Sequence, residues 1–140
     1  MSVWPAIAVA VTFCWLGMVL AISFIEAPLK FSAPGVTLPI GLGIGRLVFQ
    51  VLNIIELCWA AVLVIMVVVG RPSVVAMVGS AVAVVILLIQ LLGVRPRLTK
   101  RSDKVLAGED APRSRAHLVY VGAESIKVIG LIVAGVAFLA

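Results

Sequence analysis

The sequence of 140 residues has little charge: 12% of the residues are Asp, Glu, Lys or Arg, whereas 64% are hydrophobic. Soluble domains have roughly 25% charged residues, and disordered chains have low hydrophobicity, so neither class fits. The single histidine excludes a haem held by two histidines of one chain, and a di-metal carboxylate site normally needs two Glu-x-x-His pairs. Both cysteines, Cys14 and Cys58, fall in apolar stretches, where we expect small packing residues rather than a disulfide or a soft-metal pair.

The sequence does contain four apolar stretches, each about as long as the ~20 residues that a helix needs to cross a ~30 Å hydrocarbon core. We expect helices at about 3–25, 47–69, 73–94 and 112–140. The stretches are continuous rather than alternating, which favours helices over barrel strands. No Lys or Arg precedes the first stretch, so we expect a retained helix rather than a signal peptide. The predicted fold is an all-α membrane protein with one domain, a four-transmembrane-helix bundle over residues 1–140.

The basic residues predict the orientation of this bundle. The loops at 26–46 and 95–117 lie on one face and hold nine of the eleven Lys and Arg residues, whereas Arg71 is alone on the other face. Because Lys and Arg mark cytoplasmic loops, we expect both loops in the cytoplasm and both termini on the outer side. The expected partners are the lipid bilayer and, at the basic loop 95–115, anionic lipid headgroups, with no role in nucleic-acid binding.

The two cytoplasmic loops differ in character. Residues 98–116 are polar and mixed in charge, and we expect a mobile loop there. Residues 27–46 are mostly apolar, and the 34 residues from 36 to 69 would form about 51 Å of helix, which is too long for one span. Part of this stretch must therefore lie in the interface, re-enter the membrane or extend the second helix. Thr37 and Pro39 are suited to begin such an extension.

Charged and polar side chains inside the predicted spans are the main functional clue, because they are costly in lipid and usually functional. Steps of three or four residues place them on one face of each helix: Arg46, Gln50, Asn53 and Glu56 on the second, and His117, Tyr120, Glu124 and Lys127 on the fourth. Both helices run in the same direction, so at 1.5 Å per residue the two sets are expected to lie side by side in that order. Glu56 and Lys127 would pair near the middle of the core, and Glu26 would reach Arg46 or His117.

Two aligned polar faces predict a pocket open to the cytoplasm that ends at Glu56 and Lys127, although polar contacts that only hold the helices together are the alternative. Our leading hypothesis is permeation or transport of an ion, proton or small solute. A carboxylate at membrane depth can carry a proton, and Glu56 and Glu124 meet that need. The candidate binding residues are Glu26, Arg46, Gln50, Asn53, Glu56, His117, Tyr120, Glu124 and Lys127.

Two other functions stay open. A membrane-embedded enzyme acting on a lipid-soluble substrate, such as a quinone or an isoprenoid, would use His117, Tyr120 and Glu124 for acid–base chemistry. An accessory subunit would instead bind another membrane protein. Glu26, His117 and Glu124 are also a three-ligand candidate for a metal such as zinc, and no cofactor is predicted.

Small residues four positions apart allow membrane helices to approach closely. Such pairs are Ala76 with Ser80, Gly79 with Ala83, and Gly130 with Ala134. They suit contacts within the bundle or between copies of the chain. Because a four-helix chain of this size has little room for a pore of its own, transport favours a homo-oligomer.

The stretches WLGMVLAISFIEAPLKF (15–31) and IGRLVFQVLNIIE (44–56) resemble small bacterial four-helix integral membrane proteins. The shared feature is a first helix that ends in Glu-Ala-Pro and is followed by a phenylalanine. The His-x-x-Tyr-x-x-x-Glu-x-x-Lys run at 117–127 looks like part of the same pattern. The resemblance covers about half of the chain. It implies the four-helix fold and a bacterial inner membrane, and no particular activity.

Overall fold

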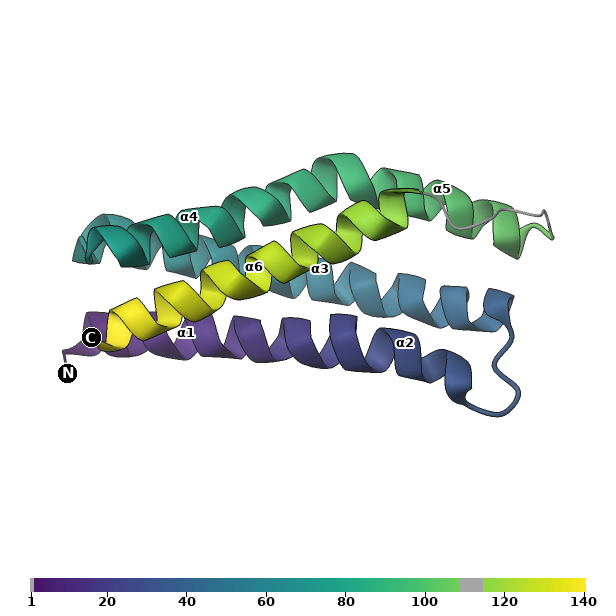
Figure 1. Ribbon diagram of the computed structural model, residues 1–140, viewed down its shortest axis with the longest axis horizontal. Coiled ribbons are helices and arrows are strands. Elements are labelled where there is room, and N and C mark those ends of the chain that lie inside the picture. The colour runs from purple at the N-terminus through teal and green to yellow at the C-terminus, as the bar shows by residue number, and fades with distance from the viewer. Residues whose placement is uncertain (1, 109–114) are drawn as a thin grey trace.

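The computed structural model describes residues 2–108 and 115–140, except for the side chains of residues 115–117. In these residues the chain forms four long helices and no strand, with both termini at the same end of the bundle (Figure 1). All four helices are long and apolar enough to cross a membrane, which confirms the predicted four-helix membrane fold.

The four long helices are built from shorter segments. The first contains α1 (Val3–Val19), the π-helical turn η1 (Leu20–Glu26), α2 (Ala27–Leu29) and the 3₁₀ turn η2 (Lys30–Ser32). The second is α3 (Leu38–Gly70), and the third joins α4 (Val74–Ile89), the π-helical turn η3 (Gln90–Val94) and α5 (Arg95–Leu106). The fourth is α6 (Arg115–Leu139), and its predicted start near residue 112 lies outside the described residues.

The apolar segment before residue 47 extends the second helix. Thr37 caps α3 by accepting a hydrogen bond from the backbone N–H of Ile40 at 3.4 Å, and Pro39 lies in the first turn, where its missing N–H costs nothing. At the other end, Arg71 adopts a left-handed backbone conformation with φ of 44°, and Ser73 then caps α4. The structure thus shows the third of the three predicted alternatives.

The third helix continues past residue 94, so the expectation that it ends there and leads into a mobile loop is wrong over residues 95–106. Pro96 lies in the first turn of α5, directly after η3, and does not break the helix. The first helix uses the same arrangement, because η1 precedes Pro28 in the first turn of α2. In both helices a π-helical turn precedes the proline, and the helix continues beyond its predicted end at residue 25 or 94.

These extensions all lie at one end of the bundle. The first three helices span 30, 33 and 33 residues, or roughly 45–50 Å, which exceeds a ~30 Å hydrocarbon core. Counted from the turn at residues 71–73, twenty helical residues bring α3 and the third helix to about residues 51 and 94. The helix length beyond these points lies at the end away from the termini (Figure 1).

The half of the bundle near the termini is tightly packed. Gly79 of α4 meets Gly130 and Ala134 of α6 so closely that a Cβ atom on Gly79 would lie 2.8 Å from the Gly130 carbonyl oxygen and from the Ala134 nitrogen. Of the predicted small residues, Gly79, Ala83, Gly130 and Ala134 therefore take part in a contact within the chain. An apolar core that includes Trp15 and Leu63 fills the space between these helices. The helix α6 crosses the bundle diagonally, from α1 at the C-terminal end of α6 towards α5 (Figure 1).

The two cysteines lie on the outside of this bundle. Cys14 and Cys58 are exposed, free thiols, so their side chains pack against the surroundings of the helices and not within the core. Many large apolar side chains are exposed in the same way along all four helices, as expected where lipid replaces water.

Candidate functional site

Three charged side chains meet inside the bundle. Glu56, Glu124 and Lys127 have exposed fractions of 1%, 1% and 0%. The Lys127 ammonium lies 2.5 Å from a Glu56 carboxylate oxygen and 2.6 Å from one of Glu124, so the predicted Glu56–Lys127 ion pair is present. One ammonium thus serves two carboxylates, which the sequence argument did not foresee, because it paired Glu124 with Asn53.

Uncharged donors complete the surroundings of the two carboxylates. The Trp15 indole N–H donates to Glu56 at 2.9 Å. The Gln90 amide donates to Glu124 at 3.2 Å and accepts from Lys127 at 2.9 Å. Ser23 donates a hydrogen bond to Glu124 as well. Because each buried charge has several partners, the network avoids the cost of an unpaired ion in lipid.

The two π-helical turns bring Ser23 and Gln90 to this network. Ser23 belongs to η1 and Gln90 to η3, and both side chains bond the same carboxylate, that of Glu124. Such turns are rare and often occur at functional sites. Sequence reasoning missed both residues, as it missed Trp15. Gln90 is an amide in an apolar span, and that signal was available in the sequence.

A second cluster lies on the other side of Glu124. The Tyr120 hydroxyl donates to Glu124 at 3.1 Å and accepts from the Arg95 guanidinium at 3.0 Å. The Arg95 guanidinium carbon lies 4.0 Å from the centre of the Phe49 ring and 4.7 Å from that of Tyr120, and the two rings meet edge to face. Arg95 is therefore held by aromatic contacts and connects, through Tyr120, to the buried ion pairs.

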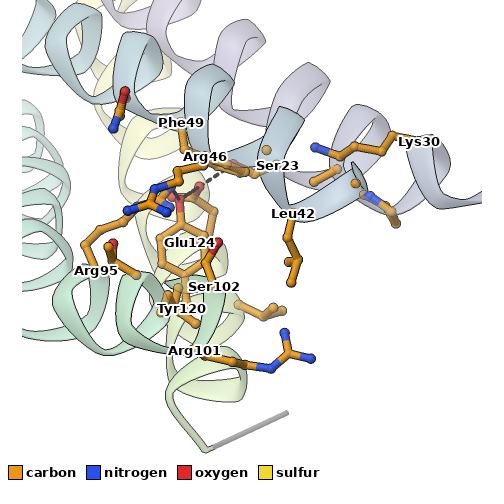
Figure 2. A pocket seen from close by; sticks show the side chains of 18 of the residues that line it. Ser23, Lys30, Leu42, Arg46, Phe49, Arg95, Arg101, Ser102, Tyr120 and Glu124 are labelled. Atoms are coloured by element: carbon orange, nitrogen blue, oxygen red, sulfur yellow. Dashed lines mark hydrogen bonds between the residues drawn. The ribbon is translucent and has the colours of Figure 1, made fainter. Parts of the chain in front are cut away.

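A cavity of about 480 Å³ opens beside this cluster, between the first helix, α3, α5 and α6. Its volume is within the range of about 300–1,000 Å³ that is typical of small-molecule sites. Figure 2 shows Arg46, Arg95, Tyr120, Ser102 and Glu124 gathered around it. Its polar and charged lining residues are Ser23, Lys30, Arg46, Gln50, Asn53, Arg95, Thr99, Arg101, Ser102, Tyr120 and Glu124.

No protein-family model matches this chain, and no curated protein or solved structure matches it significantly.

The lining is cationic and apolar. It contains four basic side chains and one carboxylate, that of Glu124 at the inner end. The rest of the wall is mainly hydrophobic and includes Phe24, Phe31 and Phe49. The cavity lies near the level at which the hydrocarbon core should end, because Ser23, Arg95 and Tyr120 are each about twenty helical residues from the terminal end of the bundle.

Several of the predicted binding residues line one cavity. Gln50 and Asn53 of α3 line the same cavity as Tyr120 and Glu124 of α6. They contribute to the wall without entering the buried network. The side chain of His117 lies outside the described residues.

The predicted contact between Glu26 and Arg46 is not present, and the alternative contact, with His117, falls on a side chain outside the described residues. Glu26 does not line the cavity; its carboxylate lies 3.4 Å from the Lys30 ammonium one turn along the helix. Arg46 is 2.5 Å from Asp103 of α5 and not beside Glu26. The reason is that the first and third helices continue beyond their predicted ends, which places Lys30 and Asp103 within reach. Lys30 and Arg46 thus each have an acidic partner outside the lining of the cavity.

The metal hypothesis has no support from the described residues, among which no group of three His, Cys, Asp or Glu side chains could hold an ion. Of the proposed ligands, Glu26 pairs with Lys30 and Glu124 pairs with Lys127, while the His117 side chain is not described.

Among the described residues, three buried polar atoms have no hydrogen-bond partner: Ser80 Oγ, Arg95 Nε and Ser102 Oγ. Leaving such a group unpaired costs about 1–3 kcal/mol. Ser80 is a buried residue of α4 outside the cavity lining, whereas Arg95 and Ser102 both line the cavity.

Proposed function

We propose that the protein is a small permease, in which the cavity receives a solute or ion and the buried network carries a proton. The observation that carries this proposal is that Glu124 belongs to both: it lines the cavity and shares the Lys127 ammonium with Glu56. Two carboxylates facing one ammonium can accept one proton without leaving an unpaired buried charge, because the other carboxylate keeps its ion pair.

The geometry supports loading from one side. The cavity lies at the end of the bundle with the long helix extensions, whereas the close α4–α6 contact and the apolar core fill the terminal half. A solute that enters the cavity stops at Glu124. Passage to the other side then requires the helices to move, as in alternating access, or a second copy of the chain, as predicted from its small size.

We place the cavity on the cytoplasmic face of a bacterial inner membrane. The loop at 33–37 lies at the end opposite the termini (Figure 1), which agrees with the basic loops and the termini being on different faces. In this orientation the basic segment 95–115 lies beside anionic lipid headgroups. The proposed bacterial inner membrane rests on the resemblance of the sequence to small bacterial four-helix membrane proteins.

The test is proton flux into liposomes that contain the purified protein and a pH-sensitive dye, driven by a potassium diffusion potential. We expect flux above that of protein-free liposomes, and we expect Glu56→Gln to abolish it. This variant should fold, because Lys127 keeps its pair with Glu124 and the new amide oxygen still accepts from Trp15.

The matched control is Asp103→Asn, the same carboxylate-to-amide change at a half-exposed side chain outside the network. Flux should persist in this variant. Wild-type liposomes without flux, or Glu56→Gln liposomes with normal flux, would contradict the proposal.

A second candidate is an enzyme acting on a lipid-soluble substrate. One observation favours it: the Tyr120–Glu124 hydrogen bond lies at a cavity with largely apolar walls, where a quinone or isoprenoid would fit. This function predicts that such a lipid copurifies with the protein. Solvent extraction and mass spectrometry would detect it, and its loss in Tyr120→Phe would favour the enzyme over the permease.

A further inference from the structure

Two unpartnered polar atoms identify the kind of ligand that the cavity accepts. The Ser102 side chain is buried, with an exposed fraction of 8%, and neither its hydroxyl nor the Arg95 Nε has a hydrogen-bond partner among the described residues. Both residues line the cavity, Arg95 at the start of α5 and Ser102 two turns further along it. Both groups can donate a hydrogen bond, so a ligand that satisfies them has to present acceptor atoms.

The charges around the cavity indicate that the acceptor is an anion. Lys30 and Arg46 have carboxylate partners, Glu26 and Asp103, but these lie outside the lining and leave the basic groups on the wall. Arg95 is held by ring contacts and by a hydroxyl group and makes no ion pair with a described residue. Basic side chains and a hydroxyl group around an apolar space are the usual partners of a phosphate or carboxylate.

The position and walls of the cavity indicate that the anion carries an apolar chain. The cavity lies at about the depth where hydrocarbon gives way to headgroups. Phe24 and Phe31 line it and are partly exposed at the bundle surface, with exposed fractions of 38% and 40%. A free inorganic anion would leave these walls without a partner, whereas a membrane amphiphile would cover them with its chain.

We propose that the cavity binds a membrane amphiphile with an acidic headgroup of the phosphate monoester type, with the headgroup at Arg95 and Ser102 and the chain along the phenylalanine wall. This inference rests on the proposed function, since it names the solute of the permease. It also gives the two unpaired donors a partner, because the headgroup oxygens accept hydrogen bonds from them.

The test measures ligand binding by the purified protein in micelles of a neutral detergent, using native mass spectrometry. The probes are dioleoyl phosphatidic acid, inorganic phosphate and dioleoylglycerol, which separate the headgroup from the chain. We expect phosphatidic acid to bind, inorganic phosphate to compete only weakly, and dioleoylglycerol not to bind. Full competition by inorganic phosphate would overturn the amphiphile, and equal binding of dioleoylglycerol would overturn the acidic headgroup.

Two variants test the assignment of the headgroup. Arg95→Gln should weaken phosphatidic acid binding by about tenfold or more, and Ser102→Ala severalfold, because each removes a donor to a charged acceptor. Ser102→Ala is the sharper test, since it removes an unpartnered hydroxyl group and so should not lower stability. The control is Arg97→Gln, which removes an exposed arginine of α5 that is not part of the lining.

Unchanged binding in both variants would overturn the inference. Its failure is distinguishable from that of the permease: proton flux without lipid binding leaves the permease standing, and lipid binding without proton flux leaves only the binding site.

Discussion

Replacing Lys127 by methionine is the most direct perturbation of the buried network. Methionine has a similar length and no charge, so packing is largely kept while the ammonium is lost. Glu56 and Glu124, with exposed fractions of 1% each, would then face each other without a cation within the core. Removing one partner of a buried ion pair typically costs 3–5 kcal/mol.

The two carboxylates would not be left equally exposed to the loss of the ammonium. Glu124 keeps hydrogen bonds from Ser23, Gln90 and Tyr120, whereas Glu56 keeps only that from Trp15 among the described residues. The variant can avoid two unpaired buried charges if one of the two carboxyl groups stays protonated. For a solvent-exposed glutamate with a pKa of about 4.3 this costs about 3.7 kcal/mol at pH 7 and about 1 kcal/mol at pH 5. In the variant the folded state holds a proton that the unfolded state releases, so its stability rises as the pH falls from 7 to 5.

The assay is reversible unfolding in mixed micelles with increasing SDS, followed by tryptophan fluorescence at pH 7 and pH 5. We expect Lys127→Met to lower the free energy of unfolding by about 3–4 kcal/mol at pH 7 and by clearly less at pH 5. Adding Glu56→Gln should recover most of the loss. The control, Lys104→Met at an exposed position, should stay within about 0.5 kcal/mol of the wild type. A loss below about 1 kcal/mol at pH 7, or one that does not depend on pH, would refute the reasoning.

Two other features of the bundle can be tested directly. Gly79→Ala should destabilise the protein in the same assay by about 1–3 kcal/mol, because its new methyl group would lie 2.8 Å from the Gly130 carbonyl oxygen and from the Ala134 nitrogen. Gly122→Ala, with open space around it, should be neutral or slightly stabilising. Equal effects would mean that the two helices are not in close contact. Cys14 and Cys58, free and exposed within spans, should resist a membrane-impermeant maleimide in intact membranes and show no disulfide on non-reducing gels. Rapid labelling of either would mean that it faces water.

The parts of the fold that depend on bulk properties could be predicted from the sequence. Four apolar stretches of span length predict four helices, and a glutamate and a lysine at matched depth predict an ion pair, because lipid penalises each charge alone. Both predictions depend on residue type and spacing. Neither needs the position of a helix end to better than a turn.

The remainder depends on local geometry that residue types do not specify. The prolines at 28 and 96 looked like helix ends, yet each follows a π-helical turn that carries the helix past it. These turns also rotate Ser23 and Gln90 towards Glu124, and a regular helix would have placed the two side chains differently. A mixed-charge segment with two prolines nearby resembled a loop, although α5 buries Ser102 and Val105 on one face.

The close contact of α6 with α4 gives α6 a natural pivot point at Gly130, where the two backbones touch. Tyr120 lies ten residues, or roughly 15 Å, along α6 from this point. A tilt of α6 by about 5° around Gly130 would move Tyr120 by roughly 1.3 Å, which is enough to break hydrogen bonds of ordinary length. Lys127, which is near the pivot point, would move by less than about 0.5 Å. The same tilt would thus release the cavity end of the network while keeping its central ion pair. Because Arg95 of α5 donates a hydrogen bond to the Tyr120 hydroxyl, a solute bound at Arg95 would act on α6 at the network residue farthest from Gly130.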